Sequence, residues 1–334
     1  MKIGFLRYEK DPPVMARYLF ALASRYGAEF FCFRPESVDV KNKKITGTFL
    51  EKGGYVERET EYPDVIDDVY SFNRKHKDLY EHLEKFCVFT FTNLGGKIKV
   101  DAILRENREA ERYLIETFQY KDVDIGDVLQ KYKKVIIKPV RGKPGRSVYR
   151  LHKEGGAYAL QLRDEICRLS PAQFNEYYAK CFCDSYLVQR YVSSRTNAGN
   201  PFDLRIHVRR GEDGEWVLVK IYPRIGNVNQ IVSNLAQGGS AGDIKEFLFE
   251  EFGSDWKKYY DELVTLSVTI PQLMQNKYDK MIDALGIDVG IDRENENELK
   301  IFEVNTFPGA KNFPFEVAEV MMQYYLFLGE NIKK

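Results

Sequence analysis

Residues 286–309 read GIDVGIDRENENELKIFEVNTFPG, and this stretch decides how the rest of the sequence is interpreted. Two runs within it, 287–292 and 299–305, alternate apolar and polar residues with the period of two that is typical of β-strands. The residues between the two runs are all polar. The stretch therefore predicts a β-hairpin, a pair of antiparallel strands joined by a polar turn.

The register of this hairpin brings acidic side chains together. We assume that Asp292, at the turn and outside the reach of any bound cation, faces Leu299. Counting back along both strands then places Asp288 opposite Glu303, and Asn305 follows on the same face. Two opposed carboxylates repel each other, and a divalent cation between them would remove that repulsion. Two carboxylates and an amide suit Mg²⁺, which keeps water and phosphate oxygens as further ligands. On the hairpin alone, an exposed acidic turn explains the residues equally well.

Size and composition exclude several classes of protein. The chain has 334 residues, enough for two or three domains. Lys plus Arg equals Asp plus Glu at 50 each, so no bulk charge favours nucleic acid or an anionic membrane. There is no long apolar run and no signal-peptide core at the start, so a membrane partner is not expected. The 5 cysteines lack paired CxxC spacing, which predicts reduced, mostly buried thiols in a cytoplasmic protein.

The first part of the chain reads as a small α/β unit. An apolar strand at 2–7, a helical stripe at 12–26 and a second strand at 29–33 predict a β-α-β unit. Two alternating segments within 38–60 predict a hairpin. We place a domain boundary near 93–96, and helical patterns follow it.

A basic, glycine-containing turn lies near the middle of the sequence. Residues 133–151 read KKVIIKPVRGKPGRSVYRL, with strands predicted at 135–138 and 148–151. Between them lies the loop 141–147, whose glycines free backbone N–H groups next to a lysine, an arrangement that can fold over phosphates. The GxxxxGK[ST] order of a P-loop is absent. Taken alone, a surface hairpin with basic residues is the commoner explanation.

Further strands and helices lead to the hairpin. Residues 186–192, YLVQRYV, form an apolar strand, and residues 202–209, FDLRIHVR, alternate strictly. Arg224 stands at the end of the next strand, and helices are predicted at 247–260 and 263–285. The strand predicted at 202–209 carries polar residues on one face, namely Asp203, Arg205 and His207. Any one of these charged residues could be a surface ion-pair partner.

Taken together, these segments resemble the ATP-grasp fold over about 97–312. The runs VIIKPVRGKPGRSV, PFDLRIHVRRGEDGEW and IVSNLAQGG look most like its spore-coat-associated YheC/YheD-like branch, which is similar to ribosomal-protein glutamate ligase-like peptide ligases. The resemblance implies an α/β (α+β) fold, in which a pre-ATP-grasp domain over 1–95 precedes an ATP-grasp domain over 96–334. The latter would consist of a nucleotide-lid subdomain, about 125–192, and a catalytic subdomain, about 193–334.

The resemblance also assigns residues to the nucleotide. Lys97 matches a first nucleotide lysine, with Lys99 as the alternative, and Lys138 matches a second that reaches the α- and β-phosphates. Residues 141–147 match a mobile flap over the phosphates, and 189–192 match the hinge that contacts adenine. The implied cofactor-binding residues are Lys97, Lys138, Arg141, Gly142, Gly145, Arg146, Ser147, Gln189, Arg190, Tyr191, Val192, Asp203 (on the ribose side), Arg205 and Asn234.

Catalytic and metal-binding roles are implied in the same way. The implied catalytic residues, which hold the transferring phosphoryl and the acyl-phosphate, are Arg224, Asn234 and Lys138. The implied Mg²⁺ ligands are Asp288, Glu303 and Asn305. The sequence departs from some ATP-grasp ligases at Gly286, where those carry an arginine, which leaves Arg224 as the substitute. The hairpin loop before Glu303 is also slightly longer than in D-alanine ligases.

The resemblance implies an ATP-dependent carboxylate–amine ligase that forms an amide through an acyl-phosphate and releases ADP and phosphate. Its cofactors would be ATP and Mg²⁺, with Mn²⁺ as an alternative, and its partners a carboxylate and an amine, each a small molecule or a peptide. The expected location is the cytoplasm, with the spore as an alternative. Two other functions stay open: a non-catalytic nucleotide-binding spore-coat scaffold, and an ATP-grasp kinase that phosphorylates a hydroxyl. The substrates cannot be read, because substrate-facing loops vary, and the oligomeric state stays open.

Overall fold

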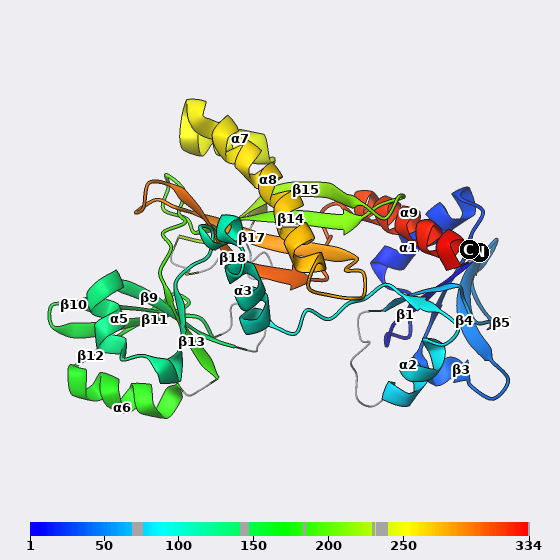
Figure 1. The fold of residues 1–334 in the computed structure, drawn as a ribbon, viewed down its shortest axis with the longest axis horizontal. Coiled ribbons are helices and arrows are strands. Elements are labelled where there is room, and N and C mark those ends of the chain that lie inside the picture. The colour runs from blue at the N-terminus through cyan, green and yellow to red at the C-terminus, as the bar shows by residue number, and fades with distance from the viewer. Residues whose placement is uncertain (69–75, 141–146, 183–184, 229–230, 232–239, 333–334) are drawn as a thin grey trace.

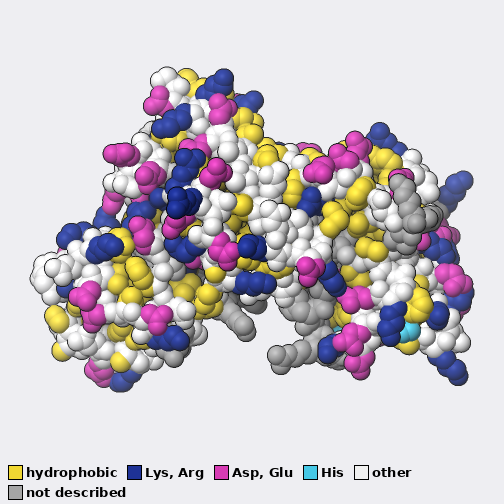
Figure 2. All heavy atoms as spheres, in the orientation of Figure 1, with side chains coloured by type: hydrophobic (Ala, Val, Ile, Leu, Met, Phe, Trp, Pro, Cys, Tyr) yellow, Lys and Arg dark blue, Asp and Glu magenta, His cyan; other side chains and the backbone are white. Residues whose placement is uncertain are grey.

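The computed structural model describes residues 1–68, 76–140, 147–182, 185–228, 231 and 240–332. Its described strands form three β-sheets, each accompanied by helices (Figure 1). Acidic and basic side chains are interspersed over the face shown in Figure 2, as expected for a chain without net charge. No helix among these residues is both long and apolar enough to span a bilayer.

The first sheet contains the predicted β-α-β unit. Strands β1 (Lys2–Leu6) and β2 (Glu29–Phe33) pair in parallel and are connected by helix α1 (Val14–Arg25). The predicted hairpin is also confirmed, as β4 (Lys44–Glu51) and β5 (Gly54–Glu61). The sheet order is β3-β4-β2-β1-β6-β7, with β5 paired to β4. Its other elements are β3 (Val38–Asp39), β6 (Val65–Asp68), α2 (Lys77–Leu83) and β7 (Val88–Phe89).

The second sheet is antiparallel and has the order β12-β11-β10-β9-β13-β8. Its strands are β8 (Thr117–Gln119), β9 (Lys134–Pro139), β10 (Tyr149–Glu154), β11 (Ala157–Leu162), β12 (Glu165–Leu169) and β13 (Tyr186–Arg190). Two capped helices pack on it. Asp124 caps α5 (Ile125–Tyr132) by accepting from the N–H of Gly126 at 2.7 Å, and a Ser170–Gln173 capping box opens α6 (Pro171–Cys181). The sequence analysis did not predict α6, β11 or β12.

The third sheet has the order β16-β15-β14-β17-β18. Its strands are β14 (Phe202–Arg210), β15 (Trp216–Ile225), β16 (Ser240–Ala241), β17 (Ala284–Asp292) and β18 (Glu298–Thr306). One face of β14 packs its apolar residues against α8 (Trp256–Gln275), with α3 (Lys97–Arg105), α4 (Arg108–Glu111) and α7 (Ile244–Phe252) nearby. Its other face carries the predicted polar row.

The predicted limits of the two helices before the hairpin are wrong. Gly253 adopts a left-handed φ of 56° and ends α7, which a residue with a side chain would do less easily. The next helix begins at Trp256 and ends at Gln275, because the Gln275 side chain there accepts from the N–H of Ile282 and turns the chain. Residues 284–285, assigned to the helix from the sequence, begin β17.

The hairpin is confirmed, but one assumption about its register is wrong. Asp292 pairs with Glu298 rather than with Leu299. A β-bulge next to Asp288 inserts Phe302 into the second strand and shifts the pairing by one residue. The bulge restores the predicted pairing of Asp288 with Glu303.

The last helix, α9 (Pro314–Ile332), returns to the first sheet and packs against α1 (Figure 1). Its Met321 and Tyr325 belong to the same apolar cluster as Ile3 and Phe20. The last helix therefore completes the apolar cluster at the first sheet. The predicted domain limits, 1–95 and 96–334, stay predictions. Of the four cysteines described, Cys32 and Cys87 are buried and the other two are exposed, so the prediction of mostly buried thiols holds only in part.

Candidate functional site

A cavity of about 480 Å³ lies between the second and third sheets. Several predicted site residues line it together: Lys97, Lys138, Ser147, Gln189, Arg190, Tyr191, Val192, Asp203, Arg205, Arg224, Asp288, Glu303 and Asn305. Others fall outside the described residues: Arg141, Gly142, Gly145, Arg146 and Asn234. The cavity thus gathers residues that lie more than two hundred positions apart in the chain.

Lys138 is held in place on β9 by a short hydrogen-bonded chain. Its Nζ donates to Oε1 of Gln189 at 2.8 Å, and Nε2 of Gln189 donates to Oγ1 of Thr117 at 2.7 Å. Burial, together with the charge of Lys97, lowers the pKa of Lys138 to about 8. A cation whose charge is disfavoured in this way gains from an anion placed beside it.

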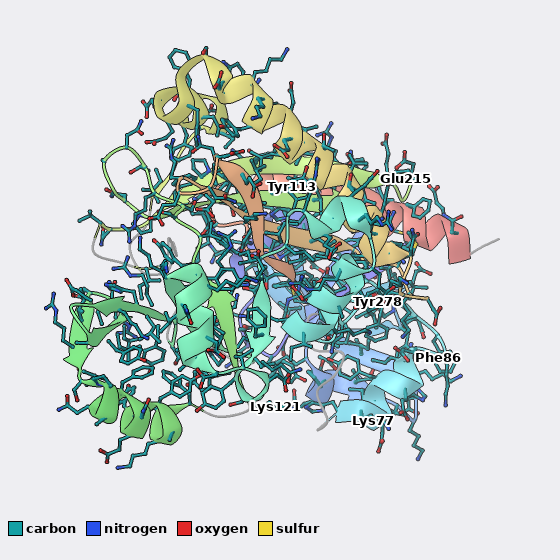
Figure 3. All side chains as sticks on the ribbon, turned by 60° about the vertical axis from the view of Figure 1, so that its left-hand side comes forward. Lys77, Phe86, Tyr113, Lys121, Glu215 and Tyr278 are labelled. Carbon is teal, nitrogen blue, oxygen red and sulfur yellow. The ribbon has the colours of Figure 1, made fainter. Side chains whose placement is uncertain are left out.

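The structure separates the two candidate lysines at the start of α3. Nζ of Lys97 lies 3.4 Å from Oε1 of Glu303, on the cavity wall. Nζ of Lys99 instead lies 4.4 Å from the ring centroid of Tyr278, a residue labelled in Figure 3. The Tyr278 hydroxyl donates to the carbonyl oxygen of Leu94 at 2.6 Å. Lys99 is therefore part of the packing around α3, and Lys97 is the lysine that reaches the cavity.

Arginines and carboxylates alternate across the floor of the cavity. Nη2 of Arg205 lies 3.0 Å from Oδ2 of Asp288, and Nη2 of Arg224 lies 2.9 Å from Oδ1 of the same carboxylate. Arg224 also donates through Nε to Oδ1 of Asp203 at 2.5 Å. Burial by itself would lower the pKa of Arg224, but Asp288 and Asp203 outweigh it and raise that pKa. These pairs follow from the strand pairing, which places Asp203 beside Arg224 and Arg205 beside Asp288.

The expected repulsion between Asp288 and Glu303 is offset in the structure. Asp288 has its two arginines and Glu303 has Lys97, while Nδ2 of Asn305 lies 3.5 Å from Oδ2 of Asp288. The described residues contain no group of three or more His, Cys, Asp or Glu able to hold a metal. Two carboxylates and one amide on neighbouring strands nevertheless fit Mg²⁺ if water and phosphate oxygens complete its shell. The Lys97–Glu303 pair is partly exposed and can open for such an ion more readily than the arginine pairs.

An ion pair between Arg190 and Asp292 joins residues 189–192, the predicted hinge, to the end of β17. Nη1 of Arg190 lies 2.6 Å from Oδ2 of Asp292, and its Nε donates to Oε2 of Glu116 at 2.9 Å. Asp292 is only 1% exposed and also accepts from the N–H of Ser193 at 3.0 Å. The Arg190 guanidinium, assigned to the nucleotide by the resemblance, is therefore occupied by carboxylates. Asp292 is a buried anchor, whereas the sequence analysis placed it at the edge of the turn.

Sequence reasoning missed several residues that line the cavity. Phe302, the bulge residue, and Phe307, just after β18, are both among its lining residues. A signal for the bulge was present, because Ile301 and Phe302 are consecutive apolar residues and so break the strict alternation. Thr117, which holds Gln189, comes from a three-residue strand whose pattern is too short to recognise.

Comparisons with known proteins identify the family of the chain. Residues 85–327 match the model of a family described as YheC/D-like ATP-grasp. The Endospore coat-associated protein YheD of Bacillus subtilis (strain 168) is 23% identical over 322 residues, covering 91% of this chain and 70% of that protein. YheC of the same organism is 25% identical over 333 residues, covering 93% and 89%.

Two solved structures are similar along nearly their whole length. The ATP-grasp ligase PsnB, complexed with precursor peptide PsnA2 and AMPPNP, has a TM-score of 0.55 at 10% identity, covering 98% of both chains. D-alanyl-alanine synthetase A from Vibrio cholerae O1 biovar eltor str. N16961 has a TM-score of 0.55 at 14% identity, covering 99% of this chain and 97% of that one. At such identities the likeness shows the fold alone, and it confirms the predicted α/β (α+β) ATP-grasp fold.

Proposed function

The chain belongs to the YheC/D-like ATP-grasp family, and from this premise we propose that it is an ADP-forming carboxylate–amine ligase. The observation that carries the proposal is one cavity lined by two lysines, three arginines and three carboxylates. An ATP phosphate chain needs cations along its length, and an acyl-phosphate needs them at its reacting end. The cavity offers both.

Each group has a proposed part in the reaction. Lys97 and Lys138 neutralise the phosphates, and the hinge at 189–192 holds adenine. Glu303, Asn305 and Asp288 would hold Mg²⁺, which would supply positive charge to stabilise the phosphates. A substrate carboxylate oxygen attacks the γ-phosphorus, the bond to the β-phosphate oxygen breaks, and ADP leaves. Arg224, backed by Arg205, stabilises the charge that develops on the transferring phosphoryl group.

The second half of the reaction forms the amide. A neutral amine attacks the acyl carbon, the bond from that carbon to the phosphate oxygen breaks, and phosphate leaves with the amine proton passing to solvent or phosphate. Water must be kept away, because it would hydrolyse the acyl-phosphate. We assign this exclusion to residues 141–147 and 236–242, of which 141–146 and 236–239 lie outside the described residues. Asn234, proposed to assist Arg224, also lies outside them.

The relatives support both the proposed ligase reaction and the proposed location. PsnB is a ligase seen with a precursor peptide, and D-alanyl-alanine synthetase is named for an amide product. By analogy, the substrates here are a carboxylate and an amine carried by small molecules or peptides. YheC and YheD are described as endospore coat-associated, so we propose a cytoplasmic protein that associates with the spore.

Mass spectrometry of the reaction mixture tests the proposal. The protein is incubated with Mg-ATP and a mixture of amino acids and dipeptides, and ADP, phosphate and new amides are quantified. A ligase releases ADP and phosphate in equal amounts with an amide. A kinase gives ADP and a phosphorylated product without an amide, and a scaffold gives neither.

Glu303→Gln is the matching variant. It removes a charged ligand and the partner of Lys97, so we expect it to abolish ADP release while the protein stays folded. Glu298→Gln is the control, because Glu298 lies on the same strand, is exposed and pairs with Lys300 away from the cavity. Turnover of Glu303→Gln at the parent rate would contradict the proposed metal site.

A further inference from the structure

Phe307 combines two features that rarely occur together. Its φ is +66°, a left-handed backbone conformation that costs a bulky residue free energy. Among the described non-glycine residues with positive φ it is the only apolar one. Its side chain is nevertheless 52% exposed, so burial of the ring does not repay the strain. The fold would be served better by glycine at this position.

Phe307, with its strained backbone, lies on the wall of the cavity. Phe307 follows the last residue of β18 and lines the cavity together with Asn305 and Thr306. The next residue, Pro308, packs closely over Gly286 and fixes the direction of the chain. Phe307 is therefore a cavity-lining residue only two positions along the chain from Asn305, a proposed metal ligand.

A second residue near Phe307 is Arg7, which directly follows strand β1 of the first sheet. Cζ of Arg7 lies 6.0 Å from the centroid of the Phe307 ring and 3.4 Å from that of Phe5. Arg7 is buried and paired with Asp67, with Nη2 2.5 Å from Oδ1. An aromatic ring attracts apolar groups and cations, and a guanidinium already lies within cation–π distance of this ring. The surface is thus suited to an uncharged apolar group.

We infer that Phe307 is a specificity-determining residue that contacts an apolar side chain on the acyl donor. The inference rests on the proposed function. Within it, the donor carboxylate must lie next to the γ-phosphate, near Asn305 and the arginines, so the rest of the donor extends toward residue 307. The substrate class is therefore a carboxylic acid with an apolar side chain, such as the carboxyl end of a leucine or phenylalanine residue.

Binding of matched donors tests the inference without requiring turnover. Calorimetry with Mg²⁺ and AMPPNP compares N-acetyl-alanine, N-acetyl-leucine, N-acetyl-phenylalanine and Nα-acetyl-lysine. The parent protein should bind the leucine and phenylalanine compounds about tenfold more tightly than the alanine compound, and the lysine compound worst. Phe307→Gly should lose this preference while melting at or above the parent temperature, because it relieves the strained φ.

Phe249→Ala is the control, because Phe249 is a 60% exposed aromatic on α7 that is not among the residues lining the cavity. It should keep the preference. The inference is overturned if the parent binds none of the four or shows no preference, if Phe307→Gly keeps the preference, or if Phe307→Gly melts well below the parent. A preference that depends on Phe307 without ADP release would support the contact between Phe307 and an apolar carboxylic acid and contradict the ligase. ADP release with a preference unchanged in Phe307→Gly would support the ligase and contradict the inference.

Discussion

At the scale of single residues, the account depends most on Lys138. A charge-assisted contact to phosphate is worth about 1.5–3 kcal/mol. Lys138→Met removes the charge and keeps the length of the side chain. We expect ATP affinity to fall by about ten- to a hundredfold with a melting temperature no lower than the parent's. Calorimetry measures the affinity, and an unchanged value would exclude Lys138 from the nucleotide site.

The lowered pKa of Lys138 makes ATP binding depend on pH. In the free protein this pKa is about 8, and a bound phosphate raises it by favouring the charged form. ATP affinity should therefore be highest below about pH 8 and fall as pH rises through it, with proton uptake on binding. Calorimetry between about pH 7 and about pH 9.5, in buffers of different ionisation enthalpy, detects both effects. Lys138→Met should lack them, and a parent affinity independent of pH would contradict the account.

Folding stability depends on pH through Lys138 in the opposite direction to ATP affinity: it increases as pH rises. Its folded pKa lies below the ordinary value of 10.5 for an unfolded lysine, so the unfolded chain holds its proton more tightly. The cost of burying the charge is full below about pH 8 and disappears as pH rises toward 10.5. The protein therefore gives up folding stability at neutral pH to keep a buried cation at the cavity.

At the scale of secondary-structure elements, the ion pair between Arg190 and Asp292 joins the end of β13 to the end of β17. Asp292→Ala leaves the Arg190 guanidinium partly uncompensated in a buried place. We expect the free energy of unfolding to fall by about 3 kcal/mol, measured by denaturant titration. Glu176→Ala removes an exposed partner of Lys180 and should cost less than about 1 kcal/mol. Equal losses in the two variants would show that Asp292 is not an anchor.

The same elements show what a single sequence can predict. Alternation predicts β14, β17 and β18, because each strand has one apolar and one polar face. It cannot predict the register, which depends on the bulge at Phe302. The pairing of Asp288 with Glu303 was obtained because an error of one residue at Asp292 and the bulge cancel each other. Strands without alternation, such as β12, leave no such pattern.

The sequence also does not show which charged residues pair with each other. The sequence shows that Asp203 and Arg205 share a face, but only the folded sheet shows that Arg224 and Asp288 pair with them. Likewise, the sequence does not distinguish Lys97 from Lys99. Only the structure shows that Lys99 packs on Tyr278, a residue far along the chain. Roles that come from contacts between distant segments require the structure.

At the scale of the whole molecule, the two ends of the chain meet. Tyr325 of α9 donates to Oδ2 of Asp67 at 2.5 Å, and Asp67 also pairs with Arg7 from the end of β1. Arg7 in turn lies near Phe307 at the cavity. The first sheet and the last helix therefore share one buried cluster, and Phe307, which follows the third sheet's strand β18, lies beside it. No local pattern in the sequence predicts that cluster, because its members are separated by most of the chain.

The central claim is that this cavity transfers the γ-phosphoryl group of ATP to a carboxylate. It is tested most directly with amino acids whose carboxylate oxygens are labelled with ¹⁸O. When the acyl-phosphate is broken by an amine, one labelled oxygen leaves with the phosphate. The account predicts released phosphate carrying one ¹⁸O atom in the parent protein and no phosphate release in Glu303→Gln. Unlabelled phosphate accompanying an amide product would contradict it.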